Sequence, residues 1–128
     1  RFEWAESGSA PATQQRIAMD TIDIVSTPSA DEAGNAHGGV RSPFVDVPLV
    51  RYQVVAGGTG LACAFVGTET PLPADVPASR YGAVESYMAQ FTASLDDTIE
   101  KGFLLAADRT QVLEDAAAKA ATLLSAAQ

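Results

Sequence analysis

Apolar residues at helical spacing in the carboxyl-terminal third constrain the fold most. They form two sets, and the first comprises Val84, Tyr87, Met88, Phe91, Leu95 and Ile99. Steps of three and four residues place these side chains on one face of a helix, and Gly102 can end this helix by adopting a positive φ. A second set, Val112, Leu113, Ala116, Ala120, Leu123 and Leu124, follows Asp108 and Gln111, which are predicted to form a capping-box pair. The pattern predicts a helical hairpin whose apolar stripes must cover something apolar.

The first part of the chain has a different character, rich in β-branched residues, glycine and proline. Residues 16–26 are predicted to form a strand, because Ile22 and Ile24 alternate with a polar residue. Residues 27–43 are polar and glycine-containing, which predicts a loop with tight turns. Residues 2–6 resemble the end of a helix.

A second strand is predicted over residues 44–55, with Pro48 at an edge or bulge because proline cannot donate to a ladder. Glycines at 57–60 would turn the chain into a third strand over residues 61–66, which makes a hairpin. Three prolines in residues 68–79 predict an extended connector. The glycine-rich turn is no nucleotide loop, since no helix can follow it.

These elements predict an α+β fold within this chain: a few short strands followed by a two-helix hairpin. We expect residues 1–79 to form a strand- and loop-rich segment, on which the helical hairpin of residues 80–128 packs. With 128 residues, the chain is one domain at most, or part of one.

The charge balance excludes several classes of partner. Eight basic against sixteen acidic residues give a net charge of −8, which argues against a nucleic-acid partner. No apolar run approaches the ~18 residues of a membrane span. The lone Cys63 forms no internal disulfide and suggests no zinc site, so we expect neither metal nor cofactor. We expect a soluble protein, and the compartment stays open between cytoplasm and export.

Catalytic residues are not expected in this chain. Serine hydrolysis uses a Gly-x-Ser-x-Gly turn and a histidine base, and no serine here lies in that pentapeptide. His37 is the only histidine and lies near Asp31 and Glu32 in a loop. An isolated loop histidine is more often a solvated side chain than a base, so His37 is a weak catalytic candidate.

The densest motif surrounds Gly38, Gly39 and Arg41. Two adjacent glycines let the backbone approach another group closely, and the Arg41 guanidinium can bind a carboxylate or backbone carbonyls. We expect this loop to dock on the body of the protein. Substrate contact is the alternative.

Residues 31–48 contain the pattern Gly-Asn-x-x-Gly-Gly-Val-Arg-x-Pro-x-Val-x-Val-Pro. This segment resembles the carboxyl-terminal part of a family of bacterial α/β-hydrolase-domain proteins. Residues 4–11 and the Gly-Phe-Leu-Leu-x-x-Asp run at 102–108 are similar to further motifs of that family. The resemblance implies an esterase-like serine hydrolase whose nucleophile and partners precede Trp4, so that no catalytic residue is carried over to this chain.

Two hypotheses follow. The first is that the chain is the carboxyl-terminal portion of such a hydrolase, which completes or covers a catalytic core and is inactive alone. It is motivated by the motifs and by apolar helix stripes with no obvious partner inside the chain. The alternative is a stand-alone binding or interaction module without catalysis, dimeric through the helical hairpin. The expected partner is therefore the remainder of the hydrolase chain or a second copy.

Overall fold

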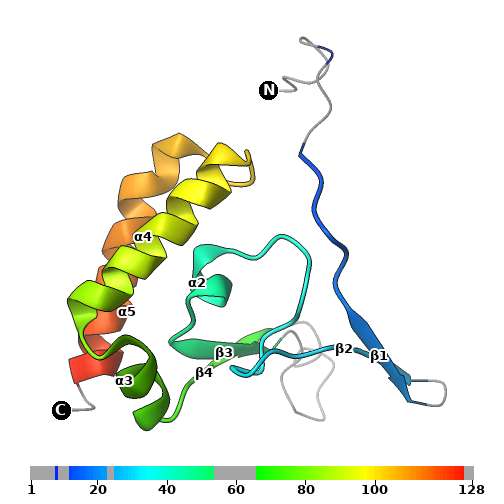
Figure 1. The fold of residues 1–128 in the computed structure, drawn as a ribbon, viewed down its shortest axis with the longest axis horizontal. Helices are drawn as coiled ribbons and strands as arrows, with labels where there is room; N and C mark the ends of the chain where they lie inside the picture. The colour runs from blue at the N-terminus through cyan, green and yellow to red at the C-terminus, as the bar shows by residue number, and fades with distance from the viewer. Residues whose placement is uncertain (1–7, 9–11, 23–24, 54–65, 126–128) are drawn as a thin grey trace.

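The computed structural model of the chain describes residues 8, 12–22, 25–53 and 66–125 (Figure 1). The elements are β1 (Met19–Ile22), β2 (Val25–Pro28), α2 (Pro43–Asp46), β3 (Val50–Gln53), β4 (Thr68–Pro71), α3 (Asp75–Tyr81), α4 (Val84–Glu100), the short 3₁₀ helix η2 (Ala106–Asp108) and α5 (Arg109–Ser125). Two antiparallel two-stranded sheets, β1-β2 and β3-β4, precede the long helix pair. The predicted α+β class is confirmed.

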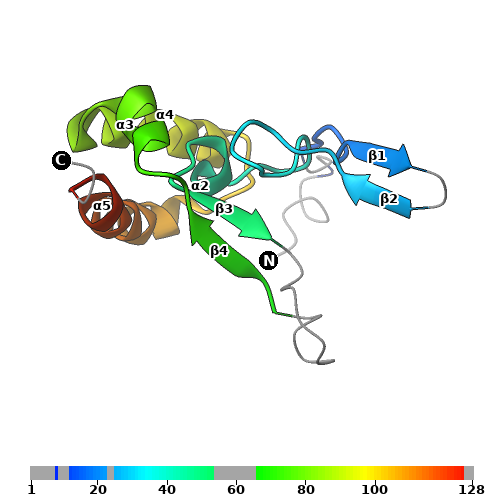
Figure 2. The ribbon, with the colours of Figure 1, turned by 90° about the horizontal axis from the view of Figure 1, so that it is seen from below.

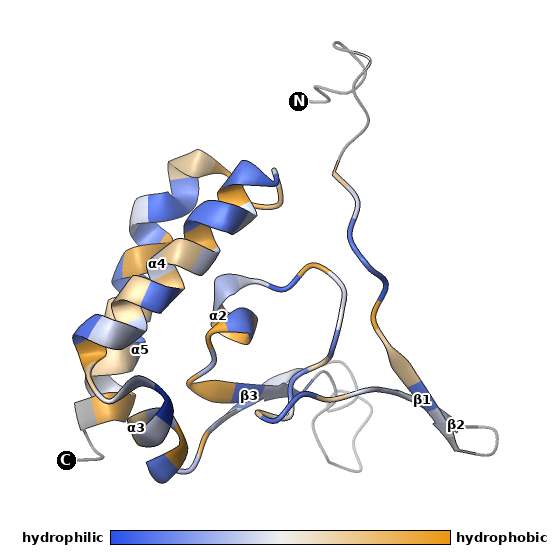
Figure 3. Ribbon diagram, in the orientation of Figure 1, coloured by the Kyte–Doolittle hydropathy of each residue, from blue (hydrophilic) through white to orange (hydrophobic). Residues whose placement is uncertain are grey.

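The predicted helical hairpin is confirmed, with α4 and α5 lying side by side (Figure 1). Figure 3 shows apolar and polar residues interspersed along α4, as one buried face requires. Gly102 has a φ of +77° and ends α4 as predicted. The Gly102 and Phe103 amides donate to the carbonyls of Ile99 (2.9 Å) and Thr98 (3.1 Å), the paired bonds of a Schellman motif.

The hydrophobic core lies between the helix pair and the segment just before β3. Tyr87, Phe91 and Leu95 of α4 and Ala116, Ala120 and Leu124 of α5 are buried together with Val47, Leu49, Val50 and Tyr81. The helix stripes therefore have a partner inside this chain. The sequence pattern offered no obvious partner for these stripes, but the polypeptide between α2 and β3 turns its apolar side chains onto the helices.

Residues 44–55 do not form one continuous strand. Pro43–Asp46 is the helix α2, and the strand β3 is Val50–Gln53, after which residues 54–55 lie outside the described part of the chain. Proline is favourable at the first position of a helix, where an amide donor would be unpaired anyway. Pro48 lies in the buried link between the two elements, and its carbonyl accepts a hydrogen bond from the Tyr81 hydroxyl at 3.1 Å.

The predicted single strand at 16–26 is also wrong, because this segment folds back on itself. β1 pairs with β2 in antiparallel register, with Thr21 opposite Ser26. Their hydroxyl groups lie 2.9 Å apart. Figure 2 shows this hairpin projecting away from the helices.

The partner of β3 comes from the predicted connector at 68–79, which instead contains β4 and most of α3. Val50 lies opposite Pro71, and Gln53 opposite Thr68. Pro71 is tolerated because β4 is an edge strand. The predicted glycine turn at 57–60 and most of the predicted strand at 61–66 lie outside the described residues. The division at residue 79 stays a prediction.

The predicted capping role of Asp108 is wrong. The chain is already helical at Ala106–Asp108, and Leu105 occupies the N-cap position without a side-chain hydrogen bond. The Gln111 side chain donates to Asp115 at 3.0 Å. An N-cap residue needs a non-helical backbone. Asp108 lies inside the 3₁₀ turn, so its backbone is helical and it cannot be the N-cap.

Candidate functional site

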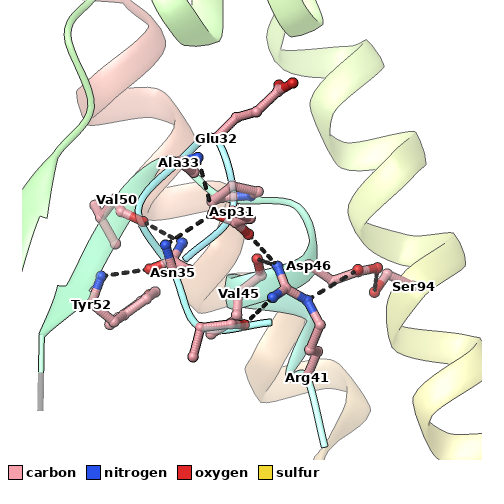
Figure 4. Close-up of polar contacts among 12 residues, drawn as sticks. Asp31, Glu32, Ala33, Asn35, Arg41, Val45, Asp46, Val50, Tyr52 and Ser94 are labelled. Atoms are coloured by element: carbon pink, nitrogen blue, oxygen red, sulfur yellow. Dashed lines mark hydrogen bonds and ion pairs between the residues drawn. The ribbon is translucent and has the colours of Figure 1, made fainter. Parts of the chain in front are cut away.

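Arg41 lies at the centre of the loop that carries the densest sequence motif (Figure 4). One terminal nitrogen, Nη2, donates to the Asp31 carboxylate and to the Val45 carbonyl, both at 2.7 Å. The other, Nη1, donates to the Ala36 carbonyl, and Nε lies 3.7 Å from the Asp46 carboxylate. A planar guanidinium can donate to several acceptors at once. Arg41 therefore connects the start of the loop, at Asp31, to its end, at Val45.

Asp31 accepts hydrogen bonds from the backbone as well. Its Oδ1 atom accepts the amides of Ala33 and Asn35, both at 2.9 Å. Partial burial acts to raise the pKa of Asp31, but the Asn35 amide and the Arg41 guanidinium outweigh it and hold this pKa below its usual range. The carboxylate is therefore ionised at neutral pH and fixed in place.

Asn35 connects this loop to the sheet. Its side chain is 1% exposed, its Nδ2 atom donates to the Val50 carbonyl at 3.3 Å, and its Oδ1 atom accepts the Tyr52 amide at 2.7 Å (Figure 4). These two bonds occupy the edge of β3 that β4 leaves free. Asn35 thus takes the place of a neighbouring strand and closes that edge.

Gly38 and Gly39 lie against the segment that leads into β1. The Gly39 amide donates to the Gln15 carbonyl at 2.8 Å, and the His37 carbonyl accepts the Ala18 amide at 2.9 Å. A Cβ atom on Gly38 would lie 2.3 Å from the Arg16 carbonyl oxygen. The two glycines are therefore required by a contact within this chain. Whether the loop also contacts substrate or a further part of the protein stays a prediction.

His37 is exposed, and its backbone rather than its imidazole fixes its position. Its amide donates to the Ser29 carbonyl at 2.8 Å. The residue borders an open cavity of about 450 Å³ together with Asp31, Asp46 and Arg80. Within the described residues, no hydrogen bond joins the imidazole to a serine or a carboxylate, and the weak catalytic candidacy of His37 stays a prediction.

Sequence reasoning missed a second site, an open groove of about 780 Å³ between the β3-β4 sheet and α5. Lys119 lies in it, with Nζ 2.6 Å from the Glu69 carboxylate and 5.6 and 5.7 Å from the ring centres of Phe44 and Tyr52. These four residues come from three distant parts of the sequence, so no local pattern could have predicted the groove.

The groove shifts the ionisation of its polar residues. Burial raises the pKa of the Tyr52 hydroxyl, which Lys119 only partly offsets. Burial acts to lower the pKa of Lys119, but Glu69 and Tyr52 outweigh it and raise this pKa. Lys119 is therefore a permanent cation at neutral pH.

The described part of the chain contains no cluster of three or more histidine, cysteine or acidic residues arranged to hold a metal ion. None of the helices described combines the length and hydropathy that a membrane crossing requires.

Comparison with known proteins identifies one family. A family model described as an alpha/beta hydrolase domain matches residues 2–114, which contain Arg41, its partners, all of α4 and the start of α5. No curated protein and no solved structure matches the chain significantly. The match covers most of the chain and confirms the resemblance drawn from its motifs: the chain belongs to the alpha/beta hydrolase domain family.

Proposed function

We propose that this chain is the carboxyl-terminal portion of an esterase-like α/β hydrolase, in which it completes or covers the catalytic core without supplying the catalytic triad. The family match over residues 2–114, in a sequence without a Gly-x-Ser-x-Gly pentapeptide, carries this proposal. The exposed position of His37, the only histidine, supports it further, because a triad histidine is held between a serine and an acid.

The surface that would contact a catalytic core is not the helix stripe, which is buried within this chain. Exposed apolar side chains remain near the Arg41 loop and the α4-α5 turn: Ile17, Val40 and Leu105. Val40 borders a small polar cavity together with Phe103 of that turn. This side of the molecule is the one we assign to the remainder of the hydrolase.

The test is ester hydrolysis by the isolated chain and by a longer protein that contains it. We expect no turnover of nitrophenyl butyrate by the 128-residue chain and clear turnover by the longer protein. In the longer protein, His37→Ala should change kcat/KM by less than about twofold, because a residue that contacts no reacting atom stabilises no transition state. Turnover by the isolated chain that His37→Ala abolishes would refute the proposal.

A second candidate function is a stand-alone interaction module without catalysis. It is favoured by the self-contained core, which buries the stripes of both long helices within one chain. Sedimentation of the chain alone and together with the remainder of the hydrolase separates the two. A symmetric dimer, or a monomer that does not associate with that remainder, supports the module, whereas association with the remainder supports the carboxyl-terminal portion of a hydrolase.

A further inference from the structure

The groove between the β3-β4 sheet and α5 already holds a cation, the ammonium group of Lys119. Its Nζ atom lies within 6 Å of the ring centres of both Phe44 and Tyr52, the range in which an aromatic face attracts a cation. The Glu69 carboxylate completes this surrounding at 2.6 Å. We call Phe44, Tyr52 and Glu69 the cation cage.

The two aromatic rings of the cage are held in place by contacts that do not involve Lys119. The Phe44 ring packs edge-on against the buried Phe91, with centroids 4.9 Å apart. The Tyr52 ring is partly buried and packs against the hydrophobic core, and its backbone amide donates to Asn35. The two rings would therefore keep their positions if the Lys119 side chain moved away.

Lys119 has an alternative anionic partner. Asp115 lies four residues earlier in α5 and borders the same groove. Side chains at this spacing are neighbours on a helix surface, and an acid four residues before a lysine is the favourable order. Lys119 can therefore turn from Glu69 to Asp115 along its own helix, which opens the cage.

The groove is suited to a ligand that combines a cation with an apolar body. Its two carboxylates, Glu69 and Asp115, exceed its single cation, and the net charge of −8 attracts cations generally. Val50, Pro71 and Leu123 provide apolar surface beside the cage.

We propose that this groove is a binding site for a small organic ammonium compound with an apolar body, and that Lys119 is an intramolecular competitor for the cation cage. The ligand cation takes the position of the Lys119 ammonium between the two rings and beside Glu69. The Lys119 ammonium then pairs with Asp115. This site is separate from ester hydrolysis and does not depend on the proposed hydrolase function.

The test is an NMR titration of the chain with benzyltrimethylammonium chloride at constant ionic strength, followed at the amides of β3 and β4. Lys119→Ala removes the competitor and is expected to tighten binding about tenfold relative to the unmodified chain. Lys101→Ala removes one positive charge from an exposed ion pair on α4 and is the matched control, with no change in affinity expected. Lys119→Gln provides a second competitor-free variant should the alanine variant fold poorly.

Two further measurements decide whether the cage itself is the site. Benzyl alcohol has the ring of benzyltrimethylammonium without its charge. It should bind to Lys119→Ala at least about tenfold more weakly than benzyltrimethylammonium does. Adding Tyr52→Leu to Lys119→Ala should return the affinity for the cation to that of the unmodified chain or below. Any one of three results would overturn the proposal. These are equal affinities of the unmodified chain and both Lys119 variants for the cation, equal affinities of Lys119→Ala for benzyl alcohol and for the cation, and no effect of Tyr52→Leu on the affinity for the cation.

Discussion

At the scale of single residues, two polar side chains organise the loop that carries the family motif. Arg41 donates to a carboxylate and to two backbone carbonyls, and Asn35 hydrogen-bonds the free edge of β3. Both side chains satisfy backbone groups that would otherwise lack partners, Arg41 in and beside the loop and Asn35 on the edge of β3. The motif Gly-Asn-x-x-Gly-Gly-Val-Arg thus encodes a fixed loop conformation.

Replacing Arg41 with lysine should destabilise the chain by about 2 kcal/mol, because an ammonium cannot serve three separated acceptors in one plane. Urea unfolding measures the change. Arg109→Lys is the matched control, since Arg109 makes a solvent-exposed pair with Asp96, and its unfolding midpoint should stay unchanged. Equal effects of both variants would contradict the role of Arg41.

The lowered pKa of Asp31 makes stability depend on pH. The unfolded chain binds the Asp31 proton more readily than the folded chain, so protonation favours unfolding. The stabilisation by this carboxylate is fully present above about pH 4, the ordinary range of an aspartate, and is lost as the pH falls further. The stability of Asp31→Asn, measured by urea unfolding from pH 3 to 6, should decrease less on acidification, and an unchanged pH dependence would contradict this assignment.

At the scale of elements, local signals and tertiary contacts determine different parts. The helices α4 and α5 follow from periodicity and from Gly102, because an amphipathic face and a positive-φ residue act within a few turns. The strand β4 has a weaker local signal, with three prolines nearby, and forms because β3 presents a hydrogen-bonding edge to it.

Gly38→Ala should separate the segment before β1 from the loop. The new Cβ atom would lie 2.3 Å from the Arg16 carbonyl oxygen at a φ of +75°, which we expect to cost about 3 kcal/mol. Gly102→Ala is the control, with a similar φ of +77° and no atom within 4 Å, and should cost only about 1 kcal/mol. Faster hydrogen exchange at the Ala18 amide in Gly38→Ala alone would confirm the separation, and equal costs for both variants would refute it.

At the scale of the whole molecule, one core joins the helix pair to the segment between α2 and β3. Two peripheral parts, the β1-β2 hairpin and the exposed apolar side chains near the α4-α5 turn, contribute little to it. This division predicts where substitutions affect stability and where they affect association.

Leu95→Ala should destabilise the chain by about 3 kcal/mol, because Leu95 is fully buried and its truncation leaves a cavity. Leu105 is 70% exposed, so Leu105→Ala should change the unfolding free energy by less than about 0.5 kcal/mol. If the remainder of the hydrolase covers this surface, Leu105→Ala should weaken that association instead. Urea unfolding measures the first effect and sedimentation the second.

The sequence by itself determined the two long helices, their buried faces, the turn at Gly102, the α+β class and the family, because each depends on residues close together in the chain. The tertiary structure alone decided that residues 43–46 are helical, that β4 pairs with β3, and that the helix stripes find their partner within this chain. It also brought Phe44, Tyr52, Glu69 and Lys119 into one groove. The physical reason is that long-range burial and pairing outweigh local propensity where a segment is short, and no local pattern records which distant partner a segment will meet.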